Sequence, residues 1–367
     1  MAEQLLSTVA HYSSLPQSYV RLPAQRPRLE EVIRDADIPT VDLGSSDNTQ
    51  IVAQVADACR SYGFFQVVNH GVEMEIMKSM MEVASEFFRL PPEEKAKHYS
   101  EDPAKKMRLS TSFNIRKEKF RNWRDYLRLH CYPLEDFVPG WPSKPSSFKE
   151  VVSTYCREVR ELGFRLLGII SLGLGVEEEY MVRVLGEQEQ HMAVNYYPKC
   201  PEPDLTYGLQ AHTDPNALTI LLQDPNVAGL QVLKDGKWIA VNPQPDAFVI
   251  NIGDQLQVYP FYVSCLPQLI IDIEGKAKEE LMRVQMQALS NGRYRSVWHR
   301  AVVNSDEERI SVASFLCPCS SVVISPPEKL VGDGSPAMYR SYTYDEYYKK
   351  FWSRNLDDDH CLELFKT

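Results

Sequence analysis

The sequence predicts a mixed α/β (α+β) protein with a double-stranded β-helix (jelly-roll) core, a helical N-terminal region and a C-terminal helix. Three observations predict this fold class. Apolar residues recur at helical spacing through much of the first half of the chain. From about His191 the sequence changes to short β-rich runs separated by turn residues, and a helical pattern returns from Tyr344 to about Asn355. Many short strands in one stretch are typical of a jelly roll, whose wide mouth can hold a metal between two sheets.

The first half of the chain is expected to be largely helical. Its first helix follows the capping-type residues Asp47 and Asn48 and ends at Gly63, which favours a helix C-terminus. The prolines at 91 and 92 stop a second helix, because the residue before a proline disfavours helical backbone. The expected elements are a loosely attached arm with a short helix at 1–37, a strand at 38–43, a strand at 64–68, a helix with an apolar stripe at 76–88, and a helix from about 147 to about 172.

The second half is expected to form strands. Asp235-Gly236 is a two-residue hairpin signal, because both positions tolerate the positive φ angles of such a turn. Residues 297–303 are strand-like, and Arg309 opens the next predicted strand. The other expected strands cover residues 218–222, 230–233, 238–241 and 248–252.

Charge and composition exclude several classes of partner. The formal net charge is −10, and no basic face dominates, which argues against nucleic acid or an anionic membrane as a partner. A local exception is the basic stretch 108–128, which is suited to flank an acidic small molecule. Residues 1–22 lack a leader pattern, and no run of about 18 apolar residues occurs, so a cytoplasmic enzyme is expected. We also expect a monomer.

The 8 cysteines are scattered through the chain without the pattern of a disulfide framework. We expect them to be reduced and mostly buried. Cys317-Pro318-Cys319 resembles half of a metal knuckle, but no second pair at zinc-finger spacing completes four ligands. The pair is therefore expected to contribute to packing.

His212-Thr213-Asp214, followed by His299, is the pattern with the most chemical content. Two histidines and one carboxylate fill one face of an octahedron in non-haem Fe(II) oxygenases and leave the other positions open. On a strand, residues two apart point to the same face, so His212 and Asp214 can reach one metal ion. In isolation the pair is weak evidence, because a lone histidine is more often a surface or core residue than a ligand.

Arg309-Ile310-Ser311 follows His299 on the next predicted strand. A guanidinium beside a hydroxyl is suited to bind a carboxylate through charge-assisted hydrogen bonds. By itself this arginine would more simply pair with an acidic neighbour among residues 306–308. The order and spacing of the two motifs together favour an iron oxygenase with an acidic co-substrate.

Segments along nearly the whole chain resemble the plant 2-oxoglutarate and Fe(II)-dependent dioxygenases. They are residues 38–43 (IPTVDL), 63–72 (GFFQVVNHGV), 195–200 (NYYPKC), 212–214 (HTD) and 251–254 (NIGD). Within that family the chain is most similar to the downy-mildew-resistance type oxygenases, which resemble salicylate hydroxylases and type I flavone synthases. This similarity is strongest in residues 122–133 (NWRDYLRLHCYP) and 347–356 (YYKKFWSRNL).

The resemblance implies an oxidoreductase of plant aromatic metabolism, in flavonoid biosynthesis, salicylic acid catabolism and defence. Salicylate hydroxylation and flavanone-to-flavone desaturation stay open as reactions, with succinate and CO₂ as co-products. The implied cofactors are Fe(II), 2-oxoglutarate as co-substrate, O₂, and ascorbate as reductant. The implied roles are Fe(II) binding by His212, Asp214 and His299, and 2-oxoglutarate binding by Arg309 and Ser311 with Asn195 and Tyr197 beside it.

The substrate side is less defined by the sequence. Phe315 lies four residues after Ser311 on the same strand face, where its ring is suited to stack on an aromatic substrate or to pack in the core. Arg128 and Tyr126 are candidates to contact a carboxylate or phenol, against the alternative of a solvated surface arginine. The histidines at 11, 70, 98, 130, 191 and 360 show no matching partners, and His70 reads as a turn residue.

The resemblance divides the chain into an arm (1–37), an N-terminal dioxygenase region (38–145), a long helical support (146–186), the dioxygenase core (187–320) and a C-terminal helical tail (321–367). Within the core, residues 258–287 stand where related chains run directly from NIGDQLQ into ALSNG. We interpret them as an insertion, with a retained in-frame intron as the favoured explanation and a folded functional loop as the other. An insertion before His299 is expected to weaken iron binding, and the alternative function is an impaired splice form that only binds a small molecule.

Overall fold

The computed structural model describes residues 5–8, 12–36, 38–258, 294, 296–324, 340–353 and 361–365. Residues 259–287 of the insertion lie outside this described part of the chain, as do Cys265, His11 and His360. Within it, no helix is long and apolar enough to cross a membrane.

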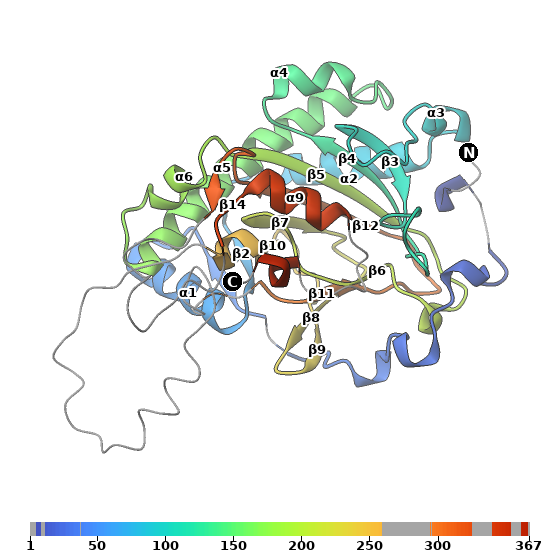
Figure 1. The fold of residues 1–367 in the computed structure, drawn as a ribbon, viewed down its shortest axis with the longest axis horizontal. Helices are drawn as coiled ribbons and strands as arrows, with labels where there is room; N and C mark the ends of the chain where they lie inside the picture. The colour runs from blue at the N-terminus through green and yellow to red at the C-terminus, as the bar shows by residue number, and fades with distance from the viewer. Residues whose placement is uncertain are drawn as a thin grey trace.

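Two sheets form the core of the described structure (Figure 1). Their strands are β1 (Thr40–Asp42), β2 (Phe64–Val68), β3 (Met107–Thr111), β4 (Asp125–His130), β5 (Glu189–Tyr197), β6 (Leu209–His212), β7 (Leu218–Gln223), β8 (Leu230–Lys234), β9 (Lys237–Ala240), β10 (Phe248–Ile252), β11 (His299–Ala301) and β12 (Arg309–Cys317). The larger sheet has the order β1-β2-β10-β7-β12-β5-β4-β3, and the smaller one β6-β11-β8-β9. A short sheet pairs β13 (Val323–Ile324) with β14 (Tyr342–Thr343). The expected jelly-roll core is confirmed.

The helices lie mainly around the larger sheet (Figure 1). They are α1 (Asn48–Ser61), α2 (Met74–Phe88), α3 (Pro92–Ala96), α4 (Leu134–Phe137), α5 (Phe148–Leu174), α6 (Tyr180–Val184), α7 (Asp254–Val258) and α9 (Tyr344–Ser353). Short 3-10 helices cover Leu6–Thr8, Gln17–Tyr19, Pro23–Gln25, Leu29–Glu31, Val138–Gly140, Pro203–Leu205 and Cys361–Phe365. The expected cap of the first long helix is present, because Asp47 accepts a hydrogen bond from the Gln50 backbone N–H. The expected Asp235-Gly236 hairpin is confirmed by positive φ angles of 50° and 76° between β8 and β9.

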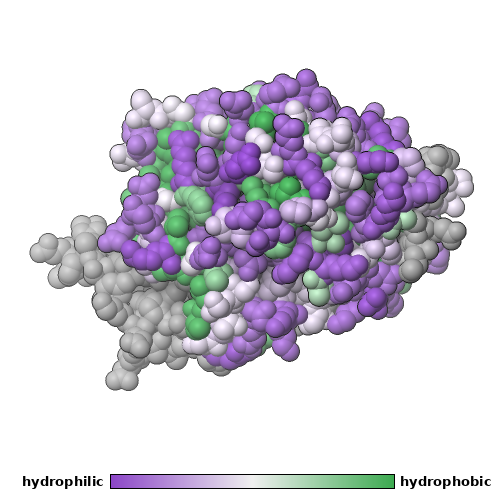
Figure 2. Space-filling view, turned by 90° about the horizontal axis from the view of Figure 1, so that it is seen from above, coloured by the Kyte–Doolittle hydropathy of each residue, from purple (hydrophilic) through white to green (hydrophobic). Residues whose placement is uncertain are grey.

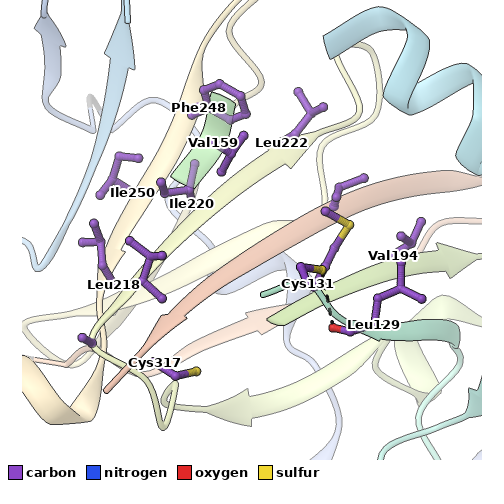
Figure 3. Packing of buried hydrophobic residues seen from close by; sticks show 14 of the residues in the cluster. Leu129, Cys131, Val159, Val194, Leu218, Ile220, Leu222, Phe248, Ile250 and Cys317 are labelled. Carbon is purple, nitrogen blue, oxygen red and sulfur yellow. Dashed lines mark hydrogen bonds between the residues drawn. The ribbon is translucent and has the colours of Figure 1, made fainter. Parts of the chain in front are cut away.

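One face of the larger sheet packs against α5 and forms the main hydrophobic core. Side chains alternate along a strand, so Phe248 and Ile250 of β10 point to this face together with Ile220 of β7. Figure 3 shows Val159 of α5 beside these residues. Gly163 gives α5 its close approach, because a Cβ there would lie 2.2 Å from Cδ1 of Leu316 in β12. The cysteines of the described ranges are free, and all except Cys319 are buried, as expected.

The opposite face of the larger sheet carries polar and aromatic side chains into the interior between the sheets. On β12 these include Arg309, Ser311 and Phe315, and on β5 they include Asn195 and Tyr197. The smaller sheet brings His212 and His299 to the same space. The fold thus places the candidate site on the inner side of the larger sheet and the helical core on its outer side.

The prediction of a largely helical first half is wrong for residues 107–130. β3 and β4 pair with each other and join the larger sheet through β5. Residues 126–130 do alternate, but Leu127 and Leu129 face the core while Arg128 faces the interior cavity. A buried arginine on the second face hides the usual apolar signature of a strand.

The N-terminal arm is firmly attached over its described residues, against the expectation of a loose arm. Leu5 and Leu6 are buried, and the backbone N–H groups of Leu6 and Ser7 donate to the Asp125 carboxylate at 3.1 and 2.7 Å. The ammonium group of Lys95 donates to the Ser7 carbonyl at 2.6 Å. Because buried polar groups need partners, these bonds tie the arm to β4 and to the residues after α2.

The surface seen in Figure 2 is dominated by hydrophilic residues. Hydrophobic residues reach that face in small patches between hydrophilic ones, which is ordinary for a globular protein. The features that indicate a function lie inside the molecule.

Candidate active site

The two histidines and the aspartate of the sequence motif converge on one point. His212 ends β6 and pairs with His299, which begins β11. The Asp214 Oδ1 atom lies 3.8 Å from Nε2 of His212 and 3.6 Å from Nε2 of His299. One ligand atom from each residue lies within 4.8 Å of the others. This is the donor set of a 2-His-1-carboxylate triad.

The expectation that one strand carries both His212 and Asp214 is wrong in detail. β6 ends at His212, and Asp214 lies just beyond it. The carbonyl of Asp214 accepts a hydrogen bond from the Asp254 backbone N–H at 2.7 Å rather than pairing in a ladder. Pro215 follows, which disfavours continuation of a regular strand ladder because proline has no N–H. The extended spacing nevertheless brings both side chains to the same point.

Neighbouring polar groups orient all three side chains. Nδ1 of His212 lies 2.9 Å from the Gln210 carbonyl, and Nδ1 of His299 lies 3.1 Å from the Val297 carbonyl. A carbonyl only accepts, so each Nδ1 carries the proton and each Nε2 presents a lone pair. Such outer partners are what a histidine ligand of a metal requires, and the residues present fit Fe(II).

The charge state of the site suits a metal. Burial, and then the neighbouring His299, lower the pKa of His212 well below its usual value. The His212 imidazole is therefore neutral at neutral pH, as metal ligation requires. The Asp214 carboxylate is the single acidic side chain of the triad and balances part of the charge of a divalent ion.

The predicted 2-oxoglutarate residues lie together beside the triad. Ser311 pairs with Asn195 across β12 and β5, and Arg309 pairs with Tyr197. The Asn195 amide donates to Oγ of Ser311 at 3.3 Å, and the Arg309 guanidinium lies 5.4 Å from the centre of the Tyr197 ring. All four line a cavity that the three triad residues also line.

Arg309 lines this cavity, and two neighbouring oxygens hold its guanidinium in place. Its Nε donates to the Val227 carbonyl at 3.1 Å, and Nη2 lies 3.5 Å from the Gln223 side-chain oxygen. Gly229 makes room for it, because a Cβ there would lie 2.9 Å from Cδ of Arg309. A buried guanidinium is suited to bind a carboxylate in two-pronged geometry.

A second cavity adjoins the first, and the two share His212, Asp214 and Phe315 among their lining residues. The predicted substrate residues Phe315, Arg128 and Tyr126 all line it. The Tyr126 hydroxyl donates to the Phe113 carbonyl at 3.2 Å, so its ring rather than its phenol is what the cavity receives. The arrangement leaves room for an aromatic molecule next to the metal ligands.

The aromatic wall of this cavity was missed from the sequence. It comes from α9, which presents Tyr348, Phe351 and Trp352. Their spacing of three and four residues is the periodicity of one helix face, which is the signal that indicates a shared surface. In Figure 1, α9 lies in front of the strands of the larger sheet. The predicted C-terminal helix thus covers the site.

A second cluster of possible ligands corrects the expectation that the other histidines lack partners. His130 and His191 are cross-strand neighbours with ring centres 3.9 Å apart, and Nε2 of His191 lies 3.2 Å from the Glu189 carboxylate. Burial lowers the pKa of both imidazoles, and the positive charges of Arg128 and Lys106 lower it further. A cation would face those same charges, so we assign no metal to this cluster. His70 occupies a turn, as expected, with Nδ1 accepting from the Val72 N–H.

Comparison with known proteins agrees with this geometry. Residues 188–318 match the 2OG-Fe(II) oxygenase superfamily, and residues 38–147 match the non-haem dioxygenase in morphine synthesis N-terminal family. The chain therefore belongs to the 2OG-Fe(II) oxygenase superfamily, and it is a 2-oxoglutarate-dependent dioxygenase.

Two curated plant relatives match the chain over nearly their full length. The chain is 66% identical to Flavanone 3-dioxygenase 2 of Oryza sativa subsp. japonica, covering 99% of this chain and 97% of that protein. It is 56% identical to Protein DOWNY MILDEW RESISTANCE 6 of Arabidopsis thaliana, covering 100% and 99%. The solved structure of JOX2 in complex with 2OG, Fe and JA is similar with a TM-score of 0.81 and 35% identity, covering 99% of this chain and 96% of that one. The chain is thus a plant oxygenase of the DOWNY MILDEW RESISTANCE 6 type.

Proposed function

We propose that the protein oxidises a small aromatic plant metabolite, by hydroxylation of salicylate, by desaturation of a flavanone to a flavone, or by both. The observation that carries the proposal is the cavity lined by aromatic side chains that adjoins the metal ligands. The name of one relative, Flavanone 3-dioxygenase 2, supports a flavanone as one of these substrates. The proposal also places the protein in flavonoid biosynthesis or in salicylic acid catabolism and defence. We further propose that it acts as a monomer in the cytoplasm.

The residues divide into three groups by task. His212, Asp214 and His299 would hold Fe(II), while Arg309 and Ser311 would hold the distal carboxylate of 2-oxoglutarate. When bound, Fe(II), 2-oxoglutarate and O₂ supply the oxidative chemistry and yield succinate and CO₂, with ascorbate as the reductant that keeps iron ferrous. The protein supplies binding and orientation rather than the chemistry itself.

The substrate cavity would orient the reacting ring and exclude water. Phe315 lines both cavities and is placed to contact a substrate ring and the co-substrate from one strand face. Trp352 and Tyr348 of α9 close the opposite side. A water-poor enclosure prevents side reactions and fixes which carbon–hydrogen bond is presented.

A panel of substrates tests the proposal. The purified chain would be supplied with Fe(II), 2-oxoglutarate, ascorbate and either salicylate or naringenin, and succinate and the aromatic product would be measured by mass spectrometry. We expect substrate-dependent succinate, together with the gain of one oxygen atom or the loss of two hydrogen atoms in the product.

Two controls make the panel decisive. Asp214→Ala should abolish succinate formation, whereas Asp235→Ala, on the exposed β8–β9 turn, should not change it. Turnover that persists without 2-oxoglutarate would contradict the oxygenase reaction. Substrate binding without any succinate would indicate a binding protein instead.

A further inference from the structure

Arg128 is a buried cation without an anionic partner. Its side chain belongs to the cavity face of β4 and is 6% exposed. The guanidinium lies 4.7 Å from the centre of the Trp352 ring and 5.6 Å from that of Tyr348. Among the residues that the structure describes, it has no ion pair and no hydrogen bond, so aromatic faces are its polar contacts.

A second arginine lies beside it. Arg108 of β3 is the cross-strand partner of Arg128, is 3% exposed, and has an Nε atom without a hydrogen-bond partner. It has no acidic partner within the described ranges either, and its guanidinium lies 5.4 Å from the centre of the Tyr126 ring. Like charges opposite one another on a sheet are destabilising.

Arg124, next to β4, differs from these two in being fully engaged. Its Nε and Nη2 donate to the Ser112 carbonyl, and Nη1 donates to the Asn195 side chain at 3.1 Å. Its guanidinium lies 4.5 Å from the centre of the Tyr126 ring, which also lines the cavity. The protein thus supplies hydrogen-bond acceptors to the buried guanidinium of Arg124. It supplies none, among the described residues, to that of Arg128.

The uncompensated charge has a physical consequence. Burial, and then Arg108, lower the pKa of Arg128 to about 10, so the group still carries its charge at neutral pH. A buried charge without partners is costly to the folded state. An anion that enters the cavity would offset this cost, because Arg128 lines the cavity that also contains His212 and Asp214.

We propose that Arg128, reinforced by Arg108, binds a carboxylate of the substrate, so that the cavity selects small aromatic acids over neutral flavonoids. This inference rests on the proposed function and narrows it to one of the two substrate classes. The carboxylate would lie between the rings of Tyr348 and Trp352, with the aromatic ring of the acid directed towards Phe315 and the metal ligands. A guanidinium presents a planar fork of donors that matches a carboxylate.

Binding and turnover of matched ligands test the inference. Salicylate and salicylamide have nearly the same shape, but only salicylate is an anion. Their retention by the Mn²⁺-loaded, 2-oxoglutarate-bound enzyme would be measured by equilibrium dialysis, and their KM values by succinate release. Charge-assisted hydrogen bonds imply that the wild type prefers salicylate by about 10- to 100-fold.

The variants then locate the preference. Arg128→Gln should raise the Kd and KM for salicylate by about 10- to 100-fold. The Kd for salicylamide and the KM for 2-oxoglutarate should stay the same in this variant. Its Tm should not fall, because the substitution removes an unpaired buried charge. Arg128→Lys should retain part of the preference as a charge without the fork. Arg116→Gln is the control, because Arg116 is exposed and paired with Glu101 at 3.0 Å.

The outcomes separate this inference from the proposed function. Equal binding of salicylate and salicylamide by the wild type, no retention of salicylate, or unchanged salicylate affinity in Arg128→Gln would overturn the role of Arg128. Absence of succinate with every substrate would overturn the oxygenase function. The dialysis result would still show whether Arg128 binds the carboxylate, because it does not depend on turnover.

Discussion

The Asn251 side-chain amide donates a hydrogen bond of 2.8 Å to Oδ2 of Asp214. Oγ1 of Thr219 donates to the same oxygen at 2.6 Å. Oδ1 is thus the oxygen that faces both histidine Nε2 atoms. Two neighbouring strands, β7 and β10, therefore decide which way the single carboxylate of the triad points.

Replacing Asn251 tests this orienting role. Asn251→Ala should weaken Fe(II) binding by about 10- to 100-fold, the usual effect of losing a partner that orients a ligand. Anaerobic titration with Fe(II), followed by the absorbance of the complex with 2-oxoglutarate, would measure it. Asn242→Ala is the matched control, because Asn242 is exposed and its amide donates to the Arg34 carbonyl. Equal iron affinity in the two variants would contradict the role.

Gly229 sets the position of Arg309 and hence the affinity for the co-substrate. A Cβ at Gly229 would lie 2.9 Å from Cδ and 3.0 Å from Nε of Arg309, which is held by the Val227 carbonyl. Gly229→Ala should therefore displace the guanidinium and raise the KM for 2-oxoglutarate about 10-fold, as expected when a charge-assisted hydrogen bond is weakened.

Steady-state kinetics at saturating substrate would measure that KM, and a separate Fe(II) titration should show no change. Gly140→Ala is the control, because a Cβ at Gly140 would meet nothing within 4 Å. A normal KM for 2-oxoglutarate in Gly229→Ala would show that Arg309 does not bind the co-substrate.

The His130–His191 pair predicts a loss of stability in mild acid. Burial lowers the pKa of His191 to about 4 and that of His130 in the same direction. An unfolded histidine titrates near 6.5, so between about pH 6.5 and 4 the unfolded chain binds more protons, and stability falls as pH falls. The hydrogen bond with His191 is the largest cause that lowers the pKa of the Glu189 carboxyl to about 2. This carboxyl therefore reduces stability only at lower pH, as the pH falls from about 4.5 to 2.

Thermal unfolding at pH 7.5 and pH 5.0 would measure this effect. Protonation of His191 in the unfolded chain should lower the free energy of unfolding of the wild type by about 2 kcal/mol at pH 5 relative to pH 7.5. His191→Gln should make the Tm less dependent on pH over this interval, whatever its effect at pH 7.5. Parallel Tm curves for the wild type and the variant would show that His191 is protonated equally in the folded and unfolded chain.

Local patterns carried most of what the sequence predicted correctly. The long helices α1, α2 and α5 have strong periodicity, and the β8–β9 hairpin has residues that tolerate positive φ, so short-range physics determines them. The metal ligands were also predictable, since their residue types are chemically restricted. Each of these signals lies within a few residues of sequence or in a motif of limited chemistry.

Other parts of the site depend on contacts between distant segments. Asn251 meets Asp214 from another strand, and His130 meets His191 only because β4 pairs with β5. For Arg128 the sequence left a substrate contact and a solvated surface position both open, because nothing local reveals that its strand faces a buried cavity. Tertiary pairing and burial, which one sequence does not encode in readable form, decide these roles.

Residues on both sides of the insertion at 258–287 are held at the metal site by contacts that do not involve the insertion. On one side, the Gln255 N–H donates to the Asn216 carbonyl at 3.1 Å, and the Gln255 amide donates to the Pro215 carbonyl at 3.0 Å. On the other side, His299 pairs with His212. The triad is therefore formed by contacts of the described residues.

Deleting residues 258–287 should raise activity. The deletion shortens the connection between α7 and β11 roughly fourfold, and the entropic cost of bringing two chain segments together falls by about 0.6 kcal/mol for each halving of the number of residues between them. The gain of about 1 kcal/mol corresponds to roughly 5-fold in the fraction of chains with His299 in place. Iron content and succinate release per mole of protein would measure it.

A same-length Gly/Ser replacement of residues 258–287 separates length from composition. If length limits the site, the replacement should keep the iron content of the full chain, and only the deletion should raise it. If the replacement behaves like the deletion, the apolar composition of 258–273 and its tendency to associate are responsible. A lower rate in the deleted chain would contradict both explanations and would make the stretch a functional part of the enzyme.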